Sequence, residues 1–211
     1  MKTMKAVLVA AFVGAMVGGA AKLVPAALEG RDGDPAGADH HHAPLVAEAT
    51  WEAGTRPAPH FTLQDQDGHA VSLASLNGRV VLLTFLDSRC TDICQVEGPA
   101  LGDVQEALSG SAPPLIVAVS VNPDDTAASA RQAADNWGWQ ADHWHWLMGS
   151  PDQLAQVWGA YGVDVQLNSE GLLHTGVLYV IDDAGNQRAG YASPVDRERV
   201  ARVVGSLVHP P

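Results

Sequence analysis

The chain has 211 residues, of which 46% are hydrophobic, and it carries a formal net charge of −12 at pH 7. This length allows one domain of about 150 residues with a buried core, together with an appendage. The acidic balance argues against nucleic acid as a partner, because phosphate binding requires a basic face.

The first 29 residues are predicted to be a signal anchor or a signal peptide. Lys2 and Lys5 precede residues 6–28, a stretch that is apolar except for Lys22 and is long enough to span a bilayer if Lys22 extends to the outer interface. An uncleaved anchor is the favoured interpretation, and small residues at 18–20 leave cleavage as the alternative. Either one predicts an extracytoplasmic location for the rest of the chain, in the periplasm or at the outer face of the plasma membrane.

Residues 30–58 are predicted to form a flexible tether, because they are rich in Gly, Ala, Pro, Asp and His and show no apolar period. The tether contains the tract His40–His42. Histidine-rich tracts bind copper or zinc loosely, and a solvated tether with chance histidines is an equal alternative. The folded domain is predicted to occupy residues 59–211.

That domain is predicted to alternate strands with helices. It opens with a β-hairpin that turns at an Asp-Gly pair, and it closes with a second hairpin and a helix. This alternation indicates an α/β sandwich of thioredoxin type, with a central mixed sheet flanked by helices. In chain order, the expected strands cover residues 59–63, 70–73, 80–86, 115–121, 144–148, 163–167, 177–181 and 187–191, and the expected helices cover 95–108, 127–137, 151–161 and 194–208.

Two of these helices carry local signals. At 151–161, Ser150 is a suitable cap and Pro151 fits the first helical position. At 95–108, Pro99 interrupts the helical spacing. Since proline lacks the amide hydrogen that a helix interior requires, the sequence predicts either a kink there or a separate short helix before it.

Cys90 and Cys94 are the two cysteines of the chain, and they directly follow the buried strand 80–86. If a helix starts just after the strand, positions i and i+4 share one face, and both sulfurs point the same way at the carboxyl edge of the sheet. A helix N-terminus favours thiolate, whereas Asp92 between the cysteines disfavours it. The pair is therefore either a dithiol/disulfide couple or two thirds of a soft-metal site.

His174 is the best candidate for a third ligand among the nine histidines. It lies just before the predicted strand 177–181. In a thioredoxin-like fold, the loop that enters this strand faces the N-terminus of the active-site helix. The long separation from the cysteines leaves a hydrogen-bonded structural histidine as the other interpretation.

The chain resembles the Sco/SenC group of copper-binding, thioredoxin-like proteins over about residues 57–208. The resemblance is carried first by Cys-Thr-Asp-Ile-Cys at 90–94 and by His174 leading into 179–182. The other matching segments are Phe-Thr-Leu at 61–63, Asp-Gly at 67–68, Leu-Asn-Gly-Arg at 76–79, Val-Ser-Val-Asn-Pro-Asp-Asp-Thr at 119–126, Leu-Met-Gly-Ser-Pro-Asp-Gln-Leu at 147–154 and Tyr-Gly-Val at 161–163.

The resemblance implies that Cys90, Cys94 and His174 bind copper, as Cu(I), Cu(II) or both. It also implies a chaperone that delivers copper to the copper A site of cytochrome c oxidase, or that maintains the thiols of that site. The partner would be an oxidase subunit or another copper or thiol protein, and residues 6–28 would hold the domain at the membrane.

The chain departs from the common family motif, which has a proline after each cysteine and a histidine before the first. Those positions hold Thr91, Gln95 and Arg89 here. The arginine places a cation beside Cys90, which favours its thiolate. These departures leave the three candidate ligands in place.

Two other functions stay open. A thiol–disulfide reductase of thioredoxin type would use Cys90 and Cys94 on a partner's cysteine pair without metal, and a redoxin-like interaction module would keep them as a fixed disulfide. Peroxidase chemistry is disfavoured, because neither cysteine is preceded by the Pro-x-x-x-Thr-x-x pattern of peroxiredoxins.

Overall fold

The computed structural model describes residues 49–110, 112–168 and 171–208. The expected signal or anchor segment 1–29, its span 6–28 and the His40–His42 tract lie outside these residues. Within the part of the chain that is described, no helix has the length and apolarity needed to cross a membrane.

A six-stranded sheet with the order β1-β10-β9-β4-β5-β6 forms the centre of the domain. β4, β5 and β6 run parallel, whereas β9 is antiparallel to β4, β10 to β9 and β1 to β10. The predicted mixed central sheet of a thioredoxin-like sandwich is thus confirmed. The strands are β1 (Ala49–Thr50), β4 (Val81–Leu86), β5 (Leu115–Ser120), β6 (Trp144–Leu147), β9 (Val177–Ile181) and β10 (Gln187–Ala192).

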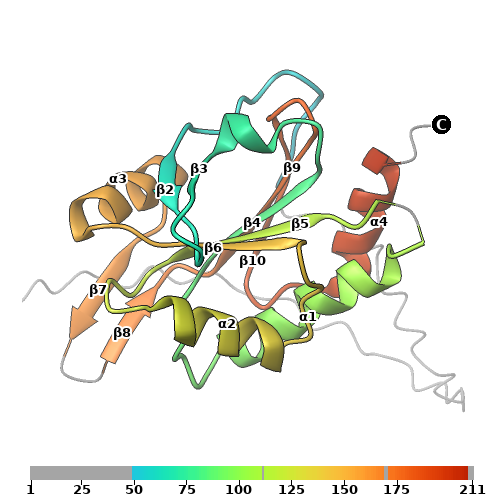
Figure 1. Cartoon of the computed structure of the whole chain (residues 1–211). Helices are drawn as coiled ribbons and strands as arrows, with labels where there is room; N and C mark the ends of the chain where they lie inside the picture. Colours follow the sequence, from blue (N-terminus) through green and yellow to red (C-terminus); the bar gives the residue numbers. More distant parts are fainter. Residues whose placement is uncertain (1–48, 111, 169–170, 209–211) are drawn as a thin grey trace, which may run out of the picture. The chain divides into compact units, whose positions relative to one another are not determined.

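Helices cover both faces of this sheet (Figure 1). One face packs against three helices and the other against one helix and a small hairpin. Adjacent residues of a central strand serve opposite faces, so Leu82 contributes to one core cluster and Leu83 to the other. That is why β4 and β5 are buried throughout. The first face carries α1 (Cys94–Ala107), α2 (Ala127–Asn136) and α4 (Arg197–Val208); the second carries α3 (Pro151–Tyr161), β2 (Thr62–Gln64), β3 (Ala70–Ser72) and the 3₁₀ helix η1 (Leu73–Leu76).

The folded part of the chain begins upstream of residue 59, inside the range expected to be a tether. Ala49 and Thr50 pair with Gly190 and Ala189 of β10. The Trp51 amide then donates to the Arg188 carbonyl at 3.0 Å. These partners lie far away in the sequence, so the local composition of 49–58 did not reveal them.

A second difference is the hairpin of β7 (Val165–Asn168) and β8 (Gly171–His174), which forms a two-stranded sheet of its own. A short strand was predicted at 163–167, and its partner β8 was not predicted. The residue of interest in this hairpin, His174, pairs with Val165.

The helix after the cysteines is continuous from Cys94 to Ala107, with Pro99 inside it. Pro99 is its sixth residue, so the missing amide forgoes one bond, to the Gln95 carbonyl, in the second turn. The neighbouring Gly98 lies directly under Trp137, because a Cβ atom there would be 2.1 Å from Trp137 Cδ2. The irregular Gly-Pro pair is therefore a site of close packing and does not break the helix.

Candidate metal centre

The two cysteines lie where β4 ends and α1 begins. Cys90 is in the connecting turn, and Cys94 is the first residue of the helix. The expectation that both occupy one helical face is therefore wrong. Residues 87–90 form a turn instead, because the Asp87 carbonyl accepts from the Cys90 amide at 3.1 Å and its Oδ1 atom accepts from the Arg89 amide at 2.9 Å. Both cysteines are free thiols, and the Cys90 side chain is close enough to raise the pKa of Cys94.

The environments of the two thiols differ. Cys94 is 0% exposed, whereas Cys90 is half-buried. Burial raises the pKa of Cys94 well above its usual range, the Cys90 side chain raises it further, and the backbone of Asp87 opposes the shift. The expected stabilisation of a thiolate by the helix N-terminus is outweighed at Cys94, so the metal-free protein carries this residue as a buried neutral thiol.

His174 ends β8 and is half-buried. Its Nδ1 atom lies 3.1 Å from the Thr175 carbonyl oxygen. Because a carbonyl can only accept, Nδ1 carries the hydrogen, and Nε2 of the neutral ring keeps its lone pair. Burial lowers the pKa of His174, and the bond to Thr175 and the charge of Asp87 oppose this shift. The neutral imidazole is thus favoured, in the tautomer that offers Nε2 to a metal.

Asp87 acts electrostatically on both parts of the candidate site, the cysteines and the histidine. Its charge raises the pKa of both Cys94 and His174. The three candidate ligand atoms are nevertheless not gathered: in the described part of the chain, Cys90, Cys94 and His174 do not form a group whose ligand atoms all lie within 4.8 Å of one another. In the structure, the two sulfurs and the imidazole are therefore not gathered within bonding distance of a common ion, although the charge of Asp87 acts on both Cys94 and His174.

Glu97 is a further titratable residue of this region that sequence reasoning missed. It lies one turn after Cys94 on α1 and is only 1% exposed. Thr84 Oγ1 donates to Glu97 Oε1 at 3.4 Å, and Oε2 is buried with no hydrogen-bond partner. Burial raises the pKa of Glu97, and Ser193, Thr84 and the Val195 backbone oppose the shift. Helical spacing in the sequence could have predicted this burial, because Glu97 shares the buried face of α1 with Cys94, Leu101 and Val104.

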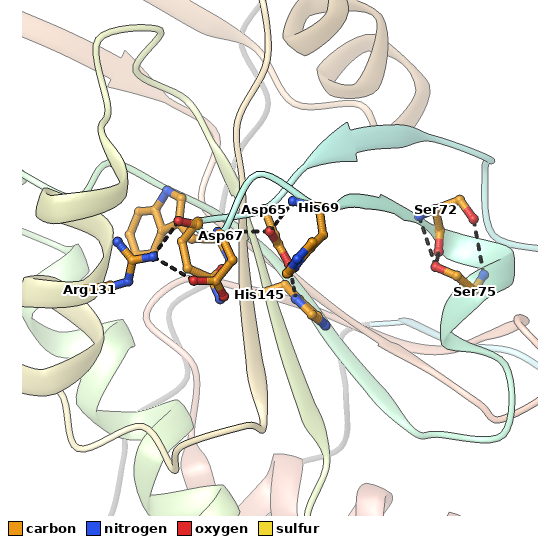
Figure 2. A network of polar contacts seen from close by, with 9 residues as sticks. Asp65, Asp67, His69, Ser72, Ser75, Arg131 and His145 are labelled. Carbon is orange, nitrogen blue, oxygen red and sulfur yellow. Dashed lines mark hydrogen bonds and ion pairs between the residues drawn. The ribbon is translucent and has the colours of Figure 1, made fainter.

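A group of potential metal ligands also occurs on the turn between β2 and β3, where the ligand atoms of Asp65, Asp67 and His69 lie within 4.8 Å of one another. Hydrogen bonds already occupy these carboxylates (Figure 2). Asp65 Oδ1 accepts from the amides of Asp67 and His69 at 2.9 Å, and its Oδ2 lies 3.1 Å from His145 Nδ1. Asp67 Oδ1 pairs with Arg131 at 2.6 Å. This group fastens the hairpin to β6 and α2.

Comparison with known proteins decides the family. The SCO1/SenC family model matches residues 51–209. The chain belongs to the SCO1/SenC family. The SCO1 protein homolog of Bacillus subtilis (strain 168) is 35% identical over 91 residues, which are 42% of this chain and 47% of that protein. The match thus spans about half the length of this curated relative.

Solved structures of Sco proteins share the fold of this SCO1/SenC protein. Arabidopsis thaliana ScoI with copper bound is 25% identical, with a TM-score of 0.61 over 70% of this chain and 94% of that one. BsSco, described as a member of the Sco family of cytochrome c oxidase assembly proteins with a disulfide switch, is 23% identical. Its TM-score is 0.64 over 79% of this chain and 100% of that one.

Proposed function

We propose that this SCO1/SenC protein binds copper in cytochrome oxidase assembly, with the metal as its cargo. The observation that carries the proposal is the pair of free thiols of Cys90 and Cys94, in which Cys90 acts on the pKa of Cys94, between the end of β4 and the start of α1 in a member of this family. Copper bound to the Arabidopsis relative supports the same metal for this chain.

The chemistry of the side chains fits a soft ion. Two thiolates and one imidazole are donors that Cu(I) prefers, and His174 offers the unprotonated Nε2 that a metal requires. The half-buried Cys90 is the first sulfur that an arriving ion meets. Cys94 then gives up its proton, because bound metal replaces the cost of a buried thiolate with a coordinate bond. His174 would complete the site if its Nε2 atom came within bonding distance of an ion held by the two sulfurs.

The finer parts of the proposal concern delivery and location. We propose that the ion passes by ligand exchange to the cysteines of a copper-receiving oxidase subunit at its copper A site. We also propose that residues 6–28 hold the domain at the outer face of the membrane, because Lys2 and Lys5 precede this apolar stretch. The same thiols would maintain that copper site in reduced form if delivery is made by another protein.

A second candidate is a thiol–disulfide reductase that works without metal. It is favoured by the separation of His174 from the two sulfurs, which leaves a dithiol pair as the assembled part of the site. In this case Cys90, the more exposed thiol, attacks a partner's disulfide, and Cys94 resolves the mixed disulfide.

Copper titration of the full chain separates the two. We expect one Cu(I) for each protein molecule, loss of binding in Cys90→Ser and Cys94→Ser, and much weaker but measurable binding in His174→Ala. His60→Ala, which changes an exposed histidine, should leave binding unchanged. The same variants are assayed for reduction of a disulfide-bonded copper A fragment of an oxidase subunit. If His174→Ala keeps full activity in that assay while either serine variant loses it, and copper binding is weak throughout, the reductase function replaces the copper proposal.

A further inference from the structure

Gln95 occupies the position after the second cysteine and makes two hydrogen bonds with its side-chain amide. Its Nε2 atom donates to the Cys90 carbonyl at 2.6 Å, and its Oε1 atom accepts from Trp137 Nε1 at 3.4 Å. The orientation of the amide is fixed by its partners, because a carbonyl can only accept and an indole nitrogen can only donate. Gln95 therefore links the turn that carries Cys90 to α1 and to the end of α2.

The Trp137 end of this link is rigid. Trp137 is buried, its ring lies against Gly98 with no room for a Cβ atom, and its centroid is 5.4 Å from Trp139 and 5.9 Å from Trp146. The Cys90 end has fewer restraints, since it lies in a half-exposed turn before the helix. A bond from a fixed platform to this turn restrains the position of Cys90 relative to Cys94.

We propose that Gln95 is a positioning residue that holds Cys90 in the dithiol arrangement with Cys94. The two free sulfurs must approach to about 2.05 Å to form a disulfide, which requires Cys90 and its turn to move. The link from Gln95 opposes that movement, so it stabilises the dithiol relative to the disulfide. Neither proline nor an apolar side chain can replace it, since both the donor and the acceptor of the amide are used.

This inference deepens the proposed function, because it rests on Cys90 and Cys94 as the working thiols. It is tested in metal-free protein, so a failure to bind copper leaves the test unaffected. In glutathione buffers the dithiol passes two electrons and two protons to glutathione disulfide, which yields the protein disulfide and two molecules of glutathione. The position of this equilibrium measures the stability of the dithiol arrangement directly.

The variant is Gln95→Met, which keeps the length of the side chain and removes both hydrogen bonds. We expect the equilibrium to shift about fivefold toward the disulfide, since a hydrogen bond contributes about 1 kcal/mol, and this corresponds to about 20 mV for a two-electron couple. Cys90 of Gln95→Met should react with iodoacetamide at least about three times as fast as Cys90 of the wild type, because the turn opens more often.

The matched control is Gln132→Met on α2, an exposed glutamine, which should leave both measurements unchanged. Circular dichroism and thermal melting of all three proteins verify that the fold is retained. A Gln95→Met protein with the wild-type glutathione equilibrium and the wild-type alkylation rate overturns the inference, whatever its melting temperature.

Discussion

The indole nitrogen of Trp139 donates to the carbonyl oxygen of Gly98 at 2.8 Å, across the interface between the segment that follows α2 and the helix that carries Cys94. Trp137, from the same segment, covers the Cα atom of Gly98. Two tryptophans thus set the position of the first turns of α1, on which Cys94 and Gln95 lie.

Gly98→Ala is expected to destabilise the protein by about 1–3 kcal/mol, because the added methyl group would lie 2.1 Å from Trp137 Cδ2 and overpack the core. Gly159→Ala on α3 is the matched control. No atom lies within 4 Å of the Cβ position there, so alanine should stabilise the helix by about 0.5–1 kcal/mol. Urea unfolding measures both, and equal effects of the two substitutions would contradict the packing described.

Glu97→Gln is expected to change how stability depends on pH. Burial raises the pKa of Glu97 above its usual value of 4.5, so the folded protein binds this proton more tightly than the unfolded chain does. The protonated Glu97 side chain therefore makes its full contribution to the free energy of unfolding below about pH 4.5. This contribution is lost as the pH rises through the folded-state pKa, by up to about 1.4 kcal/mol for each pH unit in between.

The glutamine has no such titration. The free energies of unfolding of both proteins are compared at about pH 4 and pH 8. The stability of Glu97→Gln relative to that of the wild type should increase as the pH rises. A difference between the two proteins that stays constant over this range would show that Glu97 is not held in an uncharged form.

Asp65→Ala is expected to lower the free energy of unfolding by about 2–3 kcal/mol, because the carboxylate is buried and holds two backbone amides and His145. Asp67→Ala is the control on the same turn. Its carboxylate is exposed and pairs with the exposed Arg131, a contact that solvent screens, so little change is expected. Similar losses in both variants would mean that the turn, and not Asp65 itself, determines the stability of the hairpin.

The contribution of His174 to copper affinity is expected to persist below the usual histidine pKa of 6.5. Burial lowers the pKa of His174, so protons compete with the metal for Nε2 only at lower pH. The ratio of the copper affinities of wild type and His174→Ala isolates this effect from the titration of the thiols. The ratio should therefore stay constant down through about pH 6.5 and fall only at lower pH; a fall that already begins at about pH 7 would contradict the buried, neutral ring.

Much of the fold was predictable because its signals are local. The buried runs at β4 and β5 and the capped helix α3 follow from apolar patterning and from Ser150, which caps the helix as predicted. The hairpin around Asp65 follows from its Asp-Gly turn. Trp51 and β1 were assigned to the tether, because their partners in β10 are more than a hundred residues away.

The candidate site likewise has features that the sequence predicted and features that only the tertiary structure decided. The sequence by itself determined the chemistry: two thiols after a buried strand, a histidine before the strand β9, and membership of a copper-binding group by resemblance. Only the tertiary structure decided how these groups are held, because burial, hydrogen bonds and charge act between segments that are distant in the chain. It made Cys94 a buried neutral thiol, gave His174 its tautomer, let the charge of Asp87 act on both groups and tied Cys90 to a tryptophan through Gln95.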